Sequence, residues 1–224
     1  MPTVLVIGAS RGIGLELARQ YAADGARVIA THRRPEDAAR LRALGARPLA
    51  LDVLDPGALD GLGAQFGGAA IDIAIINAGV YGPRTTGLTP PTAAEFDLVM
   101  RTNVLAPMQL LALLAPQLAA TRGKLVAISS KMGSVSLMSS SGGWLYRASK
   151  AALNVAVRAA SHDLGAQGVI CMAFHPGWVR TDMGGPDADL DVTTAVTSLR
   201  RVIDAANASH NGKFLNYNGE QLSW

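Results

Sequence analysis

The sequence of 224 residues predicts an α/β fold in one domain: a doubly wound, parallel sheet of seven strands with helices on both faces. Short apolar segments typical of strands alternate with helical segments from end to end. Most of the strand segments are continuously apolar, as is required of strands that are covered on both faces. No internal repeat, low-complexity tract or linker divides the chain, and its length suits a single α/β unit.

The expected strands span 3–7, 27–31, 48–51, 71–76, 124–128, 169–174 and 213–216. The helical segments between them span 13–24, 35–44, 55–66, 94–121, 146–166 and 191–208. Because strands and helices alternate strictly, right-handed crossovers make all the strands parallel. In such a sheet the ligand site lies beyond the carboxyl ends of the strands, near the point where the strand order reverses.

Composition and charge limit the classes of function. Hydrophobic residues make up 49% of the chain and charged residues 17%, so a large core can form. The net charge of +3 is small and the arginines are scattered, which does not favour nucleic acid but suits a small anionic ligand. The single cysteine, Cys171, lies in an apolar segment and cannot form an internal disulfide, so we expect a reducing, cytoplasmic environment. No stretch approaches about 18 uncharged apolar residues, so we expect neither a signal peptide nor a membrane-spanning helix.

A glycine-rich loop follows the first strand. Gly8, Gly12 and Gly14 form the pattern G-x-x-x-G-x-G, whose first gap is one residue longer than in the common dinucleotide-binding pattern. Gly8 permits a tight turn, while the other two glycines let backbone approach a pyrophosphate and let the helix approach the strand. A plain turn is the alternative, but the position between the first strand and the first helix favours a dinucleotide site. The same loop adds further candidate binding residues: Ser10, Arg11 and Ile13.

The end of the second strand indicates which dinucleotide is bound. Enzymes that bind NAD(H) usually place an acidic residue there, whereas the 2′-phosphate of NADP(H) requires cations. Here Arg33 and Arg34 follow the strand, no acid occurs before Glu36, and Arg11 adds a cation in the glycine loop. A guanidinium binds phosphate in a forked geometry, so NADP(H) is preferred over NAD(H). The alternative is that both arginines only solubilise a helix entrance.

Two further segments fit the same site. Asp52 and Val53 follow the third strand, where a carboxylate can accept a hydrogen bond from an adenine amino group. A helix cap is the alternative for Asp52. Asn77, Ala78 and Gly79 end the fourth strand, where small residues let the backbone pass beside the cofactor.

Tyr146 and Lys150 lie four residues apart at the start of a helical segment, so their side chains share one face. The ordinary pKa of tyrosine is about 10. An ammonium about 5 Å away favours the phenolate by roughly 3 kcal/mol, which lowers the pKa of the phenol toward working pH. Taken alone this spacing is also typical of a surface helix, but its position after the fifth strand favours an acid–base pair.

These motifs occur together in the order Gly8-x3-Gly12-x-Gly14, Asn77-Ala78-Gly79, Asn103, Ser130, Tyr146-x3-Lys150 and Pro176-Gly177. In this order the chain resembles the short-chain dehydrogenase/reductase family over essentially its whole length. The segments 129–134, 146–152, 175–185 and 216–224 resemble the sniffer-type carbonyl reductases and C-factor-like proteins of that family. The resemblance implies a Rossmann fold and NADPH-dependent reduction of carbonyls.

The resemblance also implies roles for individual residues. Tyr146 would donate a proton to the carbonyl oxygen, and Ser130 would hydrogen-bond that oxygen. Lys150 would lower the tyrosine pKa and bind the nicotinamide ribose, and Asn103 would hold a water that links Lys150 to solvent. A helix-kink asparagine is the alternative for Asn103. Ser130 lies further from Tyr146 than is usual in the family, so Ser134 is kept as the alternative and a longer loop at 136–143 is expected.

The segment after the sixth strand is expected to contact the cofactor and to cover the substrate. The family contacts fall on Pro176, Gly177, Val179 and Thr181, and residues 183–191 would form a short substrate lid. Apolar and aromatic side chains are candidates for the substrate wall, with core or interface packing as the alternative: Tyr81, Leu137, Met138, Trp144, Trp178 and Met183. Such a wall suits a lipophilic aldehyde, ketone or quinone.

Other groups and partners complete the expectations. His175 is expected to pack or cap at a strand end, and the histidine spacing predicts no metal site. The long helices at 94–121 and 146–166 are apolar enough to pair, and family members pair through them, so a homodimer or homotetramer is expected. Two rival functions stay open: a dinucleotide-binding sensor of the C-factor type and an NAD-linked alcohol dehydrogenase.

Overall fold

The computed structural model describes residues 1–66 and 69–224 and has the predicted fold, with one parallel sheet in the order β3-β2-β1-β4-β5-β6-β7. The strands are β1 (Thr3–Ile7), β2 (Arg27–His32), β3 (Arg47–Ala50), β4 (Ile73–Ile76), β5 (Lys124–Ile128), β6 (Ile170–His175) and β7 (Lys213–Asn216). The order reverses between β1 and β4, which run side by side in parallel. The predicted Rossmann fold is therefore confirmed, and its ligand site is expected at the carboxyl ends of these two strands.

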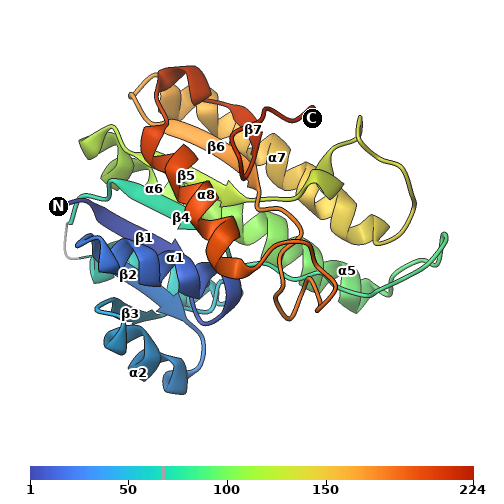
Figure 1. Ribbon diagram of the computed structural model, residues 1–224, viewed down its shortest axis with the longest axis horizontal. Coiled ribbons are helices and arrows are strands. Elements are labelled where there is room, and N and C mark those ends of the chain that lie inside the picture. Colours follow the sequence, from blue (N-terminus) through green and yellow to red (C-terminus); the bar gives the residue numbers. More distant parts are fainter. Residues whose placement is uncertain (67–68) are drawn as a thin grey trace.

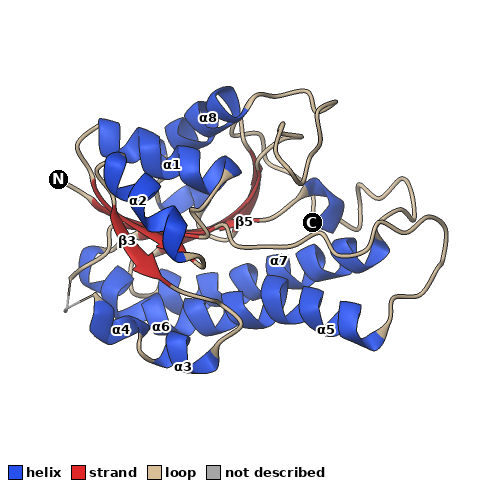
Figure 2. Ribbon diagram, turned by 90° about the horizontal axis from the view of Figure 1, so that it is seen from below, coloured by secondary structure: helices blue, strands red, loops and turns tan. Residues whose placement is uncertain are grey.

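Helices cover both faces of the sheet (Figure 2). One face carries α1 (Gly12–Ala23), α2 (Pro35–Ala43) and α8 (Val192–Ala205), and the other carries α6 (Ala106–Thr121) and α7 (Trp144–Gly165). In β1, Val4 and Val6 pack in the core cluster of the first face, and Leu5 and Ile7 pack in that of the second. Since both faces are buried, the strand is apolar throughout, as the sequence indicated.

Two helical segments differ from the prediction. The expected helix at 55–66 is divided into α3 (Pro56–Asp60) and α4 (Leu62–Gln65), with Gly61 as the cap that ends the first. The expected helix at 94–121 begins as α5 (Ala93–Met100), passes through the π-helical segment η1 (Arg101–Leu105) and continues as α6. Pro107 has no N–H group, so it cannot donate the α-helical bond to the carbonyl of Asn103, and the helix widens before it.

The combined helix at 93–121 is long and apolar enough to cross a membrane by length and composition alone. In this fold, however, it contacts β4, β5 and α7. Its inner face buries Leu110, Leu114 and Leu118 in the core. The inner face of this helix therefore belongs to the core, while other parts of its surface are exposed.

Three connections extend beyond the carboxyl edge of the sheet (Figure 1). They are residues 77–92 after β4, 129–143 after β5 and 176–191 after β6. The second contains the short 3₁₀ turn η2 (Lys131–Gly133), and a further turn, η3 (Ala208–His210), precedes β7. Together with the glycine loop after β1, these connections surround the candidate site.

Candidate active site

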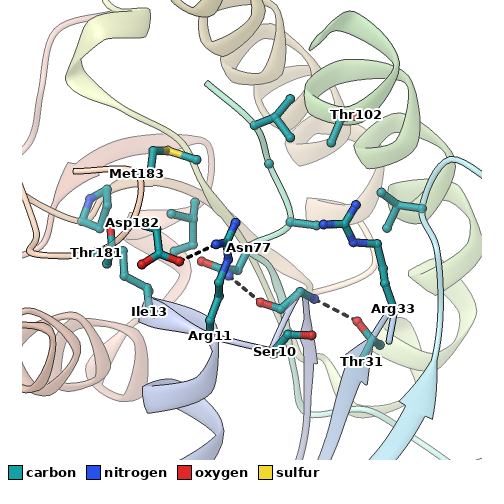
Figure 3. Close-up of a pocket in the computed structure, with 18 of the residues that line it drawn as sticks. Ser10, Arg11, Ile13, Thr31, Arg33, Asn77, Thr102, Thr181, Asp182 and Met183 are labelled. Atoms are coloured by element: carbon teal, nitrogen blue, oxygen red, sulfur yellow. Dashed lines mark hydrogen bonds and ion pairs between the residues drawn. The ribbon is translucent and has the colours of Figure 1, made fainter. Parts of the chain in front are cut away.

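A pocket of about 490 Å³ lies at the carboxyl edge, around the point where the strand order reverses (Figure 3). It is lined by fifteen of the predicted cofactor-binding residues: Gly8, Ser10, Arg11, Gly12, Ile13, Arg33, Asp52, Val53, Asn77, Ala78, Gly79, Tyr146, Lys150, Pro176 and Thr181. Residues from six separate segments therefore meet where the fold predicts a ligand.

Three predicted cofactor residues do not line this pocket. Gly14 packs behind the loop, because a Cβ atom there would collide with the carbonyl oxygen of Gly8. Gly177 has a φ of +88°, and a Cβ atom there would press on Leu190. Val179 is buried and bridges to Leu190. These residues shape the backbone around the pocket, as Gly14 was predicted to do by letting helix and strand approach.

The glycine loop is held open by hydrogen bonds from neighbouring strands. Gly8 has a φ of +86°; its N–H donates to Thr31 Oγ1 at 2.8 Å, and its carbonyl accepts from Asn77 Nδ2 at 2.7 Å (Figure 3). Arg11 is the N-cap residue of α1 and makes no side-chain capping bond. Backbone N–H groups at a helix start attract anions, so this end of α1 fits the phosphates of a dinucleotide.

The cations around the pocket differ in how they are paired. Arg34 forms ion pairs with Glu36 at 3.5 Å and Asp37 at 3.3 Å. Arg11 pairs with Asp182 across the mouth of the pocket (Figure 3). Arg33 lines the pocket and is exposed, and within residues 1–66 and 69–224 it has no ion pair. Arg33 is thus the guanidinium placed to take up an anion at the end of β2.

Two aspartates after β3 have separate roles. Asp55 is the N-cap of α3 and accepts from the Gly57 N–H at 2.9 Å. Asp52 accepts from the Leu54 N–H at 3.0 Å, is exposed, and lines the pocket. The capping role that was the alternative for Asp52 is therefore filled by Asp55, and Asp52 keeps carboxylate capacity for a ligand.

Tyr146 and Lys150 are both buried and line the pocket from the first turns of α7. Lys150 Nζ lies 5.6 Å from the centre of the Tyr146 ring and donates to the Ile128 carbonyl at 2.9 Å. Burial raises the pKa of Tyr146 to about 12, partly opposed by a hydrogen bond with Ser130 and assisted by the neighbouring Tyr81. Burial also lowers the pKa of Lys150 to about 8.

The lowered tyrosine pKa expected from Lys150 alone is therefore not found in this structure. The spacing to Lys150 considers only the charge of the lysine, whereas the largest influence on the Tyr146 pKa is burial, which disfavours the charged phenolate. The Tyr146 phenol therefore keeps its proton at ordinary pH.

Asn103 is fully buried in η1, and its side-chain amide is used within the protein. Its Oδ1 accepts from the Val80 N–H at 2.9 Å, and its Nδ2 donates to the Val80 carbonyl at 2.8 Å and to Ser149 Oγ at 3.0 Å. The amide thus joins the segment after β4 to α7, beside Lys150. This arrangement supports a positioning role for Asn103, and its Oδ1 keeps one further lone pair that could accept a hydrogen bond from the expected water.

The two candidate serines occupy different surroundings. Ser130 is the N-cap of η2, accepts from the Met132 N–H at 3.1 Å, and contacts the Tyr146 hydroxyl closely enough to affect its pKa. Ser134 Oγ donates to the Trp224 carbonyl at 2.9 Å and accepts from the Leu137 N–H at 3.2 Å. The geometry favours Ser130, although it lies beside the tyrosine rather than on the pocket wall.

The predicted substrate residues are only partly brought together. Tyr81 stacks on Tyr146 with ring centres 4.6 Å apart, and Met183 lines the pocket. Trp144 Nε1 donates to the Thr89 carbonyl and Trp178 Nε1 to the Gly184 carbonyl, each on the connections that surround the site. Apart from Met183, none of the substrate candidates lines this pocket, and two of them are exposed on the loop before α7: Leu137 and Met138.

Several pocket residues were not predicted. Val80, Thr102 and Ser129 each lie next to a residue of a predicted motif, and this adjacency is the signal that was available. The other pocket residues that were not predicted are Thr31, His32, Leu51, Leu54, Leu98, Ile128, Arg180, Asp182 and Val192. Their place in the site depends on contacts between distant segments.

His175 is buried at the end of β6 and does not line the pocket. Burial, with a smaller contribution from the charge of Lys131, lowers the pKa of His175 to about 4. The ring is therefore neutral at ordinary pH. In the part of the chain that the structure describes, no group of three or more His, Cys, Asp or Glu side chains is arranged to hold a metal ion.

Fold and pocket together define a Rossmann-type α/β protein whose ligand site lies at the switch point of the sheet. Residues 2–190 match the family described as short chain dehydrogenase. The chain belongs to the short-chain dehydrogenase/reductase family of oxidoreductases.

Individual relatives agree with this assignment. The chain is 40% identical over 155 residues to the C-signal protein of Myxococcus xanthus, covering 69% of this chain and 93% of that protein. Carbonyl reductase Sniffer of D. melanogaster superposes with a TM-score of 0.92 at 31% identity, over 100% of both chains. An NADPH-bound carbonyl reductase from chicken fatty liver superposes with a TM-score of 0.91 at 31% identity, over 100% of this chain and 99% of the other.

Proposed function

We propose that the protein is an NADPH-dependent reductase that converts an uncharged aldehyde, ketone or quinone carbonyl to an alcohol. The observation that carries the proposal is the pairing of Tyr146 and Lys150, both buried on the wall of the pocket that also contains the glycine loop. A tyrosine hydroxyl can donate a proton, and a lysine ammonium can stabilise the phenolate that remains. Their combination is suited to moving a proton beside a bound dinucleotide.

In this proposal each residue handles a defined atom. When bound, NADPH supplies the hydride from its nicotinamide ring. Tyr146 donates the proton of its hydroxyl to the carbonyl oxygen, and Ser130 hydrogen-bonds that oxygen as negative charge develops on it. The Lys150 ammonium stabilises the phenolate that remains after the proton has left, and Asn103 positions α7 through Ser149.

The preference for NADPH over NADH rests on Arg33. Its exposed guanidinium lies at the end of β2 without an ion pair among the described residues, whereas Arg34 is paired with two carboxylates. A 2′-phosphate would give Arg33 a charge-assisted, forked partner that a ribose hydroxyl cannot provide. Asp52 remains the candidate for the adenine amino group.

The segment 183–191 is proposed as the substrate lid. Its two ends are held by hydrogen bonds: Arg84 donates to the Met183 carbonyl at 2.7 Å, and the Arg180 N–H donates to the Leu190 carbonyl at 2.8 Å. Met183 lines the pocket and Tyr81 stacks behind Tyr146, and these side chains support a lipophilic substrate.

A homodimer or homotetramer in the cytoplasm completes the proposal. Exposed apolar side chains lie along the long helices on the outer face, including Leu105, Met108 and Val155. Pairing of these helices between copies would cover them. The buried free thiol of Cys171 fits a reducing environment.

The test is NADPH oxidation, followed by its absorbance, with a panel of aliphatic and aromatic aldehydes, ketones and quinones, and with NADH in parallel. The proposal predicts turnover with at least one class and a higher kcat/KM with NADPH. NADPH binding without turnover on the whole panel would contradict it.

That contrary result would favour a second candidate, a signalling protein that binds dinucleotide without turnover. The 40% identity to a protein named C-signal is the observation behind it. Replacing Tyr146 by Phe separates the two functions, because a binding protein keeps its output when the phenol hydroxyl is removed.

A further inference from the structure

Thr102 lines the pocket, and its hydroxyl has no hydrogen-bond partner among the described residues. Its side chain is buried, with 6% of its surface exposed, and it lines the pocket on the side where Figure 3 also draws Arg33. Across the described residues, four buried side-chain polar atoms have no hydrogen-bond partner: Thr102 Oγ1, Gln117 Oε1, His175 Nδ1 and Arg200 Nε. Of these four residues, Thr102 is the one that lines the pocket.

The helix would normally satisfy this hydroxyl by itself. A threonine within a helix commonly donates to the carbonyl one turn earlier, but Thr102 Oγ1 makes no such bond. The residue lies in the π-helical segment η1, a type of distortion that occurs frequently at functional sites. The side-chain amide of the adjacent Asn103 makes hydrogen bonds to Val80 and Ser149, whereas the Thr102 hydroxyl has no partner.

The neighbours of η1 indicate which part of the pocket the hydroxyl serves. Arg101 and Leu105 of η1 lie beside Val53 and Leu54 around a small second cavity. The segment after β3 is where the adenine-binding carboxylate is proposed. Thr102 is therefore on the adenine side of the pocket, while Asn103 faces α7.

We propose that the Thr102 hydroxyl hydrogen-bonds the adenine end of the bound dinucleotide, at the purine or its ribose. The inference rests on the proposed function in that it requires the pocket to bind NADPH. A hydroxyl can donate and accept, so it can pair with a ring nitrogen, an amino group or a ribose oxygen. Because Thr102 Oγ1 is shielded in the protein alone, the bond requires the side chain to turn its hydroxyl toward the bound ligand, which then gives the oxygen the partner that it lacks.

The test compares Thr102→Val, which removes the hydroxyl and keeps the shape, with Thr102→Ser, which keeps the hydroxyl. Dissociation constants are measured by calorimetry for NADPH and for adenosine 2′,5′-bisphosphate, a fragment without nicotinamide. Thr102→Val is expected to weaken both ligands by about tenfold, which corresponds to about 1.4 kcal/mol, and Thr102→Ser to bind nearly as the unchanged protein does.

Thermal unfolding without ligand supplies a second readout. Thr102→Val removes a buried hydroxyl that has no partner, so its melting temperature is expected to rise by about 2–4 °C while its stabilisation by NADPH falls. Gln117→Met is the matched control, because it removes another buried oxygen without a partner, away from the pocket. It should leave both dissociation constants unchanged.

Unchanged binding of both ligands by Thr102→Val would overturn the inference, as would equal weakening by Thr102→Ser, which would assign the effect to the methyl group. Weakening of NADPH without weakening of the fragment would overturn the placement at the adenine end. Failure of the unchanged protein to bind either ligand is a different result, and it would overturn the proposed function itself.

Discussion

The ring of Tyr81 stacks on the ring of Tyr146, with centres 4.6 Å apart and planes inclined by 21°. The guanidinium of Arg84 lies over the other side of the stack, 4.8 Å from the centre of the Tyr81 ring. Arg84 also donates to the Met183 carbonyl, so the stack connects the proposed lid to the proposed proton donor. Burial raises the pKa of Tyr146 to about 12, and the neighbouring Tyr81 adds to the rise, so the hydroxyl stays protonated.

The charge of Lys150 is expected to reduce the stability of the free protein. Burial lowers its pKa from 10.5 to about 8, so from pH 8 to about 10.5 the unfolded chain binds more protons than the folded protein and stability rises with pH. Below pH 8 the full cost of burying the charge is present, up to about 3 kcal/mol. Lys150→Met should therefore be more stable than the unchanged protein at pH 7, with an advantage that shrinks toward pH 10.5.

Urea unfolding at pH values from 7 to 10.5 measures this difference in the free energy of unfolding. A difference that stays constant over the range would show that the lysine does not titrate there, and would contradict the described burial of its charge.

Arg33→Asp tests the source of the cofactor preference. Loss of a charge-assisted bond to the 2′-phosphate is expected to weaken NADPH by about 10- to 100-fold and to change NADH much less. Arg42→Asp is the matched control, since Arg42 is an exposed arginine on α2 outside the pocket. Dissociation constants for both cofactors decide the outcome, and equal weakening of NADPH and NADH by Arg33→Asp would reject the assignment.

The ion pair between Arg11 and Asp182 spans the mouth of the pocket, and under the proposed function it would compete with a cofactor phosphate for the Arg11 guanidinium. Asp182→Asn is expected to strengthen NADPH binding by up to about fivefold, because it leaves the guanidinium to the ligand. Asp189→Asn removes a nearby exposed carboxylate and serves as the control for net charge. The expectation fails if both variants bind NADPH alike in a salt titration.

Ser130 and Ser134 should separate in function and stability. Ser130→Ala is expected to lower kcat by about 100-fold, because it removes a donor to the developing oxyanion. Ser134→Ala should keep kcat and lose about 1 kcal/mol of stability, since Ser134 bonds the Trp224 carbonyl. Steady-state kinetics and urea unfolding of both variants distinguish the roles, and the reverse pattern would assign the oxyanion role to Ser134.

Much of the fold could be predicted because the relevant signals are local. Continuous apolar segments marked the strands, and the glycine pattern marked the turn where Gly8 needs a positive φ. Periodicity could not detect the break at Gly61 or the π-helical segment, because the apolar spacing continues through both. Periodicity also could not predict which residues contact one another across the pocket.

The site shows the same division. The motifs identified most cofactor-binding candidates, but the partners that decide their states come from other segments. Arg11 pairs with Asp182, which lies 171 residues later in the sequence. The Ser134 hydroxyl donates to the carbonyl of Trp224. The pKa of Tyr146 likewise depends on burial by the whole pocket rather than on the spacing to Lys150.

The most direct test of the central claim is the effect of Tyr146→Phe on turnover and on NADPH binding, measured in the same preparation. The account predicts that kcat falls by about a thousandfold while the NADPH dissociation constant changes by less than about twofold. Retained turnover in this variant would contradict the assignment of Tyr146 as proton donor.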